Sequence, residues 1–173
     1  MGLATHSLTL MRHAKSSWDD ASLSDHDRPL NARGERDAPE MGQRLKSRGI
    51  RPSLILASTA RRTTETARAV ARAVGFPLEF IHRERGLYLA SPDEIMATVC
   101  DQDPTFRNII VIGHNPGMSY LANALSDDLP GDMPTAAMIT LEADVDDWQG
   151  FAYAARCVVG YDYPKNAQGI ITR

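Results

Sequence analysis

The chain has 173 residues, and its 19 basic and 22 acidic side chains give a formal net charge of −3. This length favours a single domain over residues 1–173 with a hydrophobic core of its own. The nearly balanced charge argues against nucleic acid or a membrane surface as a partner. The sequence also shows neither an apolar run of membrane-spanning length nor the pattern of a signal peptide. Any strongly basic site must therefore be local.

The cysteines and three of the histidines show no pattern of a metal or cofactor site. Cys100 and Cys157 lie in apolar surroundings without metal-ligand spacing, which favours free thiols in a reducing compartment over a disulfide. His6, His26 and His82 lack the short spacings, such as His-x-His, that metal sites use. We therefore expect a soluble, cytoplasmic protein that needs no metal and no cofactor.

The first predicted elements are a strand and a capped helix, separated by a long polar loop. An apolar run predicts the strand over residues 7–11, and the loop extends from Lys15 to Arg33. Asn31 is suited to cap a helix that runs to about Arg48 and ends at Gly49. Several aspartates in the loop lack the glycine and the closing glutamate of a calcium site, so we expect them to be solvated. They are Asp19, Asp20, Asp25 and Asp27.

Strands and helices continue to alternate along the rest of the chain. A short apolar strand over 54–57 precedes an amphipathic helix over 61–74, which ends at Gly75. A Ser-Pro pair starts the next helix, and an almost wholly apolar run is typical of a strand buried on both faces. These and the later elements are a helix over 91–100, a strand over 108–112, a helix over 117–125, and strands over 136–141 and 152–159. The alternation predicts an α/β fold: a three-layer α/β/α sandwich with helices on both faces of a mostly parallel sheet.

Basic or histidine-bearing loops follow three of the predicted strands. They are residues 12–16 (RHAKS), 58–62 (STARR) and 113–116 (GHNP). A strand that ends in such a loop is a common way to present chemistry at the edge of a sheet. Guanidinium groups stay charged and offer paired donors that match phosphate oxygens. The three loops therefore indicate chemistry on a phosphoryl group.

These loops resemble the motifs of the histidine phosphatase superfamily, also called phosphoglycerate mutase-like. The superfamily hallmark is Arg-His-Gly after the first strand, where this chain has Arg12, His13 and Ala14. The alanine departs from that pattern but is similar to the SixA-type branch of phosphohistidine phosphatases, which opens Met-Arg-His-Ala-Lys-Ser as residues 11–16 do. Residues 27–34 (DRPLNARG) and 113–117 (GHNPG) resemble two further segments of that branch. The resemblance spans roughly residues 7–160.

The resemblance implies a role for four residues. His13 is the nucleophile that takes the phosphoryl group, and its ordinary pKa of about 6.5 leaves the neutral, attacking form available at physiological pH. Arg12 and Arg62 bind the phosphoryl oxygens, and His114 donates to them. The family spacing of Ser, three residues, Arg, three residues, Thr favours Arg62 over Arg61, with Ser58 and Thr66 as the flanking matches.

Other residues keep two interpretations. Lys15, Ser16 and Arg28 either line the phosphate pocket or hold the loop in a solvated position. Many superfamily members place a glutamate after the second helix to protonate the leaving oxygen, and Glu84 is the candidate here. Glu84 could equally belong to a surface charge cluster with its arginine neighbours. SixA-type enzymes are understood to manage without a strong acid, since an imidazole leaving group takes up a proton easily.

The resemblance predicts a phosphatase of the SixA type that works through a phosphohistidine on His13. Its expected partner is a phosphorylated protein such as a histidine-containing phosphotransfer domain. One alternative is a small-molecule phosphomonoester phosphatase or a mutase acting on a small phosphorylated metabolite, although the chain is short for the insertions that a mutase pocket needs. Another alternative is a phosphate-recognition module with little catalysis.

Overall fold

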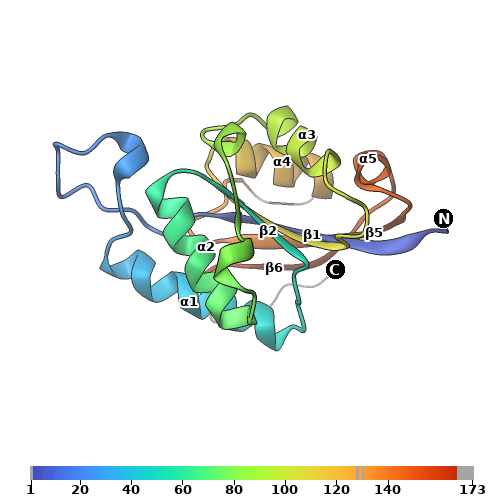
Figure 1. Cartoon of the computed structure of the whole chain (residues 1–173), viewed down its shortest axis with the longest axis horizontal. Coiled ribbons are helices and arrows are strands. Elements are labelled where there is room, and N and C mark those ends of the chain that lie inside the picture. Colours follow the sequence, from blue (N-terminus) through green and yellow to red (C-terminus); the bar gives the residue numbers. More distant parts are fainter. Residues whose placement is uncertain (1, 128, 130, 167–173) are drawn as a thin grey trace.

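A six-stranded sheet forms the middle of the protein. The computed structural model describes residues 2–127, 129 and 131–166. The strands follow the order β3-β2-β4-β1-β5-β6 across the sheet (Figure 1). Their bounds are β1 Ala4–Arg12, β2 Leu54–Ser58, β3 His82–Glu84, β4 Asn108–Gly113, β5 Met138–Val145 and β6 Cys157–Asp162.

Most strand pairs in this sheet are parallel. β4 pairs in parallel with β1 and β2, and β2 pairs in parallel with β3, whereas β5 runs antiparallel to both of its neighbours. In the register, Arg12 lies opposite Gly113, and Ala57 lies opposite Ile112. Because parallel strands end at the same edge, the loops after β1, β2 and β4 meet there.

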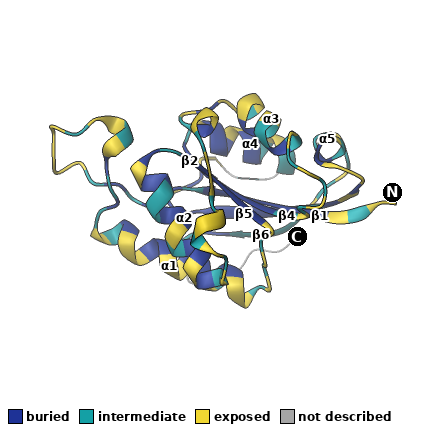
Figure 2. Ribbon diagram, viewed as in Figure 1, coloured by how far each residue is buried: buried dark blue, intermediate teal, exposed yellow. Residues whose placement is uncertain are grey.

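Helices cover both faces of the sheet, which confirms the predicted three-layer α/β/α sandwich. In Figure 1, α1 and α2 lie on one side of the strands and α3, α4 and α5 on the other. Neighbouring residues of β4 alternate between the two apolar cores: Ile110 and Ile112 pack in one, Ile109 and Val111 in the other. Figure 2 shows the strands buried between the helical layers. The helices are α1 Ala32–Ser47, α2 Arg61–Val74, α3 Pro92–Cys100, α4 Gly117–Ser126 and α5 Trp148–Phe151.

The helix ends follow the sequence signals. The Asn31 side chain accepts a hydrogen bond from the Gly34 N–H at 2.9 Å, and the Ser91 hydroxyl accepts one from the Glu94 N–H at 3.2 Å. Gly75 ends α2 with a φ of 76°, a conformation that favours glycine. Within the described residues, no helix is both long and apolar enough to cross a membrane.

One strand prediction was wrong, and one strand was missed. The strand predicted over 152–159 begins five residues later, because α5 and the turn after it take up the preceding segment. Asp147 caps α5 by accepting a hydrogen bond from the Gly150 N–H at 2.7 Å. Strand β3 was not predicted at all. It has three residues, His-Arg-Glu, at the exposed edge of the sheet, so it carries no apolar pattern to reveal it.

Candidate active site

His13 lies directly after β1, at the edge where the three loops meet. Its backbone N–H donates to the Gly113 carbonyl at 3.0 Å, which continues the pairing of β1 with β4 beyond the last strand residue. The ring is buried, and its Nδ1 lies 2.7 Å from the Ala14 carbonyl oxygen. Since a carbonyl can only accept, Nδ1 carries the proton and Nε2 keeps its lone pair. His13 is therefore in the tautomer that a nucleophile at Nε2 requires.

Arg62, in the first turn of α2, lies between two histidines. Its Nε donates toward His13 Nε2 at 3.4 Å, and its Nη2 donates to His114 Nδ1 at 3.2 Å. Because His114 accepts at Nδ1, it carries its proton on Nε2, which donates to the Ser58 hydroxyl at 2.7 Å. The two rings, with centroids 5.4 Å apart, thus hold opposite tautomers around one guanidinium.

The two flanking residues of the Ser-Arg-Thr motif hold this arrangement in place. Ser58, the last residue of β2, accepts the hydrogen bond that fixes the His114 ring. The Thr66 hydroxyl accepts from the Ala14 N–H at 3.1 Å and donates to the Arg62 carbonyl at 2.7 Å. Thr66 thereby ties α2 to the residue that follows His13. The contacts of Ser58 and Thr66 therefore explain why these two residues flank Arg62 at this spacing.

Burial and the neighbouring arginines keep both histidines neutral. Burial, opposed by the Ala14 carbonyl and reinforced by Arg62 and Arg12, lowers the pKa of His13 to about 4. Burial, Arg62 and His13 lower the pKa of His114 to about 3. At pH 7 the His13 ring is therefore neutral, with Nε2 unprotonated and no need for a separate base.

Arg12 and Arg28 carry guanidinium donors that the described residues do not satisfy. Arg12 Nη1 donates to the Met133 carbonyl at 2.9 Å. Among the described residues, Arg12 Nε and the Nε and Nη1 of Arg28 are buried without a hydrogen-bond partner. Burying an N–H group without an acceptor costs free energy, and an oxyanion is a suitable acceptor for a guanidinium. The site therefore has unused capacity for a phosphoryl group.

Sequence reasoning missed Asp25, which was expected to be solvated. Its carboxylate accepts from Arg62 Nη2 at 3.0 Å, from the Tyr88 hydroxyl at 2.5 Å, and from Arg28 Nη2. Burial would raise the pKa of Asp25, but the hydrogen bonds from Tyr88, Arg28 and Arg62 outweigh it and hold that pKa below its ordinary value. The available signal was its place three residues before Arg28, in the loop that follows the His13 motif.

Tyr88 was also missed. It follows the short 3-10 turn Arg85–Leu87, and its ring packs edge-on against His114, with centroids 5.3 Å apart. On its other side it contacts His26, at 4.9 Å between centroids. Tyr88 therefore forms a wall of the site and directs its hydroxyl at Asp25.

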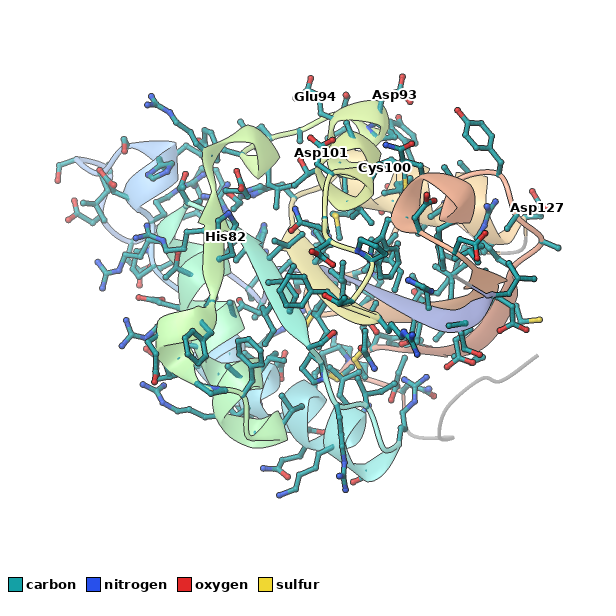
Figure 3. The ribbon with its side chains drawn as sticks, turned by 45° about the vertical axis from the view of Figure 1, so that its right-hand side comes forward. His82, Asp93, Glu94, Cys100, Asp101 and Asp127 are labelled. Carbon is teal, nitrogen blue, oxygen red and sulfur yellow. The ribbon has the colours of Figure 1, made fainter. Side chains whose placement is uncertain are left out.

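Glu84, the candidate acid, does not join this cluster. It ends strand β3 opposite Ser58, and within the described structure its carboxylate contacts His82 Nε2, at 2.5 Å. Figure 3 shows His82 on the edge strand, and it shows Asp93 and Glu94 directed outward from α3. The described contacts therefore give Glu84 a hydrogen bond with His82 and none with His13.

The remaining candidates differ in their positions. Lys15 accepts at its carbonyl from the Asn31 N–H at 2.9 Å, and Ser16 is buried in an isolated bridge with Leu30. These backbone contacts join the two ends of the loop. Arg28 lies over the exposed Trp18 ring, 3.1 Å from its centroid, in addition to its contact with Asp25.

Arg61 and Arg62 differ in exposure and in their partners. The Arg61 side chain is 56% exposed and pairs with Glu65 at 2.8 Å, whereas the Arg62 side chain is 5% exposed and lies within the site. In the described part of the chain, no group of three or more His, Cys, Asp or Glu side chains is arranged to hold a metal ion.

Comparisons with known proteins show what the whole chain is similar to. A family model described as histidine phosphatase superfamily (branch 1) matches residues 8–86. An uncharacterised protein of Mycobacterium leprae is 32% identical over 119 residues, which cover 67% of this chain and 71% of that protein. The chain belongs to the histidine phosphatase superfamily. An uncharacterised chloroplastic protein of Arabidopsis thaliana is 42% identical over 69% of this chain, and the match spans 58% of that relative's length.

Solved structures place this histidine phosphatase among SixA-like folds. The Agrobacterium tumefaciens protein assigned as phosphohistidine phosphatase SixA matches with a TM-score of 0.78 and 27% identity, covering 92% of this chain and 98% of that one. The predicted resemblance in family and fold is thereby confirmed. Superfamily membership and this SixA-like neighbour indicate a phosphatase, which is a hydrolase.

Proposed function

We propose that this histidine phosphatase removes phosphoryl groups from phosphohistidine on a protein, such as a histidine-containing phosphotransfer domain. In the first step, His13 Nε2 bonds to phosphorus while the bond from phosphorus to the substrate nitrogen breaks, and the departing imidazole takes up one proton from solvent, which the second step returns. In the second step, a water oxygen bonds to phosphorus, the bond to His13 breaks, and phosphate leaves while the water proton passes to solvent. Arg12 and Arg62 bind the phosphoryl oxygens in both steps.

The placement of the two carboxylates carries this proposal. Glu84 pairs with His82 at 2.5 Å, and Asp25 is held ionised by the donors around it. The described contacts thus support a nucleophile and an oxyanion cradle, and they give neither carboxylate a hydrogen bond to His13. An alkoxide needs a protonated acid beside it, whereas an imidazole with a pKa of about 6.5 leaves readily. Transfer from one imidazole to another is also nearly balanced in energy, because the attacking and departing groups are alike.

A second candidate substrate is a small, reactive phosphate ester. The observation in its favour is that both histidines of the site are buried: His13 is 8% exposed and His114 is 3% exposed. Covered sites suit small ligands better than a folded domain. An aryl phosphate would meet the same requirement for a leaving group that departs unaided.

Free thiols support a cytoplasmic location. Both Cys100 and Cys157 are unpaired. Proteins of oxidising compartments use such residues for disulfides, whereas a reducing cytoplasm keeps them free. We therefore propose that the protein is cytoplasmic.

Substrate ranking tests the proposal. The kcat/KM values of the parent protein and Glu84→Gln are measured on a phosphorylated phosphotransfer domain, on nitrophenyl phosphate and on glycerol phosphate. We expect that order of rates in both proteins. Efficient hydrolysis of glycerol phosphate that falls by about 10²–10⁴-fold in Glu84→Gln would overturn the proposal in favour of a metabolite phosphatase with Glu84 as its acid. Failure to turn over any of the three would indicate a phosphate-recognition module.

A further inference from the structure

The loop between β1 and α1 places a carboxylate in the oxyanion cradle. This loop, residues 15–31, projects beyond the helical layers in Figure 1 and is largely exposed in Figure 2. Its single 3-10 turn, Asp25–Asp27, buries no residue. The turn nevertheless directs Asp25 at Arg62, the guanidinium that contacts both catalytic histidines.

We propose that Asp25 is an internal competitor for the phosphoryl site: its carboxylate takes the place of substrate oxygens on Arg62 and Tyr88 and must withdraw before a phosphate binds. This inference rests on the proposed function in one respect, since it takes the phosphoryl group to enter beside His13 Nε2. It adds Tyr88 to the donors that the substrate would use.

The hydrogen bonds of Arg62 show why the two anions compete. Its Nη2 serves both Asp25 Oδ2, at 3.0 Å, and His114 Nδ1, at 3.2 Å. A phosphoryl group bonded to His13 Nε2 would lie against the neighbouring edge of the same guanidinium, because Arg62 Nε lies 3.4 Å from that nitrogen. The carboxylate and the phosphoryl group would then share the Nη2 group and the single positive charge of Arg62, and the two anions would repel each other. This repulsion favours departure of the carboxylate when a substrate binds.

Withdrawal of the carboxylate leaves Arg62 oriented. The Asp25 backbone carbonyl accepts separately from Arg62 Nη1 at 2.6 Å. Rotation of the Asp25 side chain would free Nη2 and the Tyr88 hydroxyl while this second contact persists. The Asp25 side chain is 41% exposed, so it has solvent to rotate into. The Asp25 carboxylate is therefore not needed to keep Arg62 in position.

Polar contacts, which open at low cost, fasten the tip of the loop. Beside the contacts of Asp25, His26 Nε2 lies 2.9 Å from the Thr59 hydroxyl. At the base, the bridge between Ser16 and Leu30 holds the two ends of the loop together. Segments with exposed polar contacts and little buried apolar area belong to the least stable parts of a fold. The tip can therefore move while the base stays in place.

Orthovanadate affinity tests the inference without any substrate turnover. Calorimetric titration compares the full chain with Asp25→Asn, Asp25→Ala and a control, Asp27→Asn, whose carboxylate lies on the same turn and accepts from the Ser24 hydroxyl at 2.9 Å. We expect both Asp25 variants to bind vanadate about tenfold more tightly. The control should match the parent. KM for nitrophenyl phosphate should fall in parallel with the vanadate dissociation constant.

Several outcomes would overturn the inference. Unchanged or weaker vanadate affinity in both Asp25 variants would show that the carboxylate does not compete. Weaker affinity in Asp25→Ala alone would make Asp25 a positioning residue for Arg62. A double variant, Asp25→Ala with Tyr88→Phe, should bind vanadate less tightly than Asp25→Ala, and equal affinity would remove Tyr88 from the donor set. Because vanadate binding is measured directly, loss of the proposed phosphohistidine activity would leave these results valid.

Discussion

Replacing Arg62 with alanine removes the group around which the site is organised. In the structure its Nε lies 3.4 Å from His13 Nε2 and its Nη2 lies 3.2 Å from His114 Nδ1, so both N–H groups face the position of the transferring phosphoryl oxygens. Loss of a preorganised donor to a developing charge costs about 2–4 kcal/mol of transition-state stabilisation. We therefore expect Arg62→Ala to lower kcat/KM by about 30- to 1000-fold.

Its neighbour provides a matched control. The Arg61 side chain is 56% exposed, and its ion pair with Glu65 one helical turn away is of a kind worth about 0.3–0.5 kcal/mol. Arg61→Ala should thus change kcat/KM by less than about twofold. Arg62→Lys, which keeps the charge but loses the paired donors, should recover only part of the loss.

Steady-state hydrolysis of nitrophenyl phosphate measures these effects, and circular dichroism during heating confirms that each variant is folded. Equal losses for the two alanine variants would refute the assignment of Arg62 from the geometry. A larger loss for Arg61→Ala would show that the motif is displaced by one residue. Normal activity of a folded Arg62→Ala would refute the proposed role of the guanidinium altogether.

Three further predictions concern the nucleophile and the loop behind it. His13→Ala should abolish turnover without unfolding the protein, and rapid quenching should trap an acid-labile phosphoenzyme in the parent only; turnover by the variant would exclude His13 as nucleophile. Because burial lowers the pKa of His13 to about 4, kcat/KM should stay level from pH 7 to about pH 5 and fall toward pH 4 as the ring is protonated, whereas a fall centred near pH 6.5 would show that the free-enzyme pKa is unperturbed. Gly34→Ala should destabilise the fold, lowering the melting temperature, because a Cβ there would lie 2.2 Å from the Lys15 carbonyl oxygen; an unchanged melting temperature would contradict that close approach.

Sequence reasoning located the parts of the site that strand ends carry. His13 follows β1, Ser58 ends β2 and His114 follows β4, so alternation of strands and helices was enough to bring them to one edge. Local spacing also separated Arg62 from its neighbour, because the turns of α2 place Thr66 on the same side as Arg62. Periodicity and chain order are therefore sufficient for these residues.

The residues that sequence reasoning missed depend on the path of loops. Asp25 meets Tyr88 across 63 positions of the chain, and neither residue lies in a periodic element. Aspartates in a polar loop look alike in sequence, and the one local signal for Asp25, its place three residues before Arg28, does not reveal a contact with Tyr88. Chain position can also suggest a role that the contacts do not support. Glu84 lies where the family places an acid, but its carboxylate contacts His82.

The antiparallel direction of β5 determines which of its two ends lies at the site. The chain leaves the parallel strands β1, β2 and β4 at the edge where His13 lies. It enters β5 at that same edge, because β5 runs in the opposite direction. There the Met133 carbonyl accepts from Arg12, and the Ala136 N–H donates to the His13 carbonyl at 3.0 Å. The segment before β5 thus holds Arg12 and His13 in place from the C-terminal half of the chain. Because these contacts come from the segment before β5, a change in its length would alter the rim of the site while the sheet, His13 and His114 keep their places.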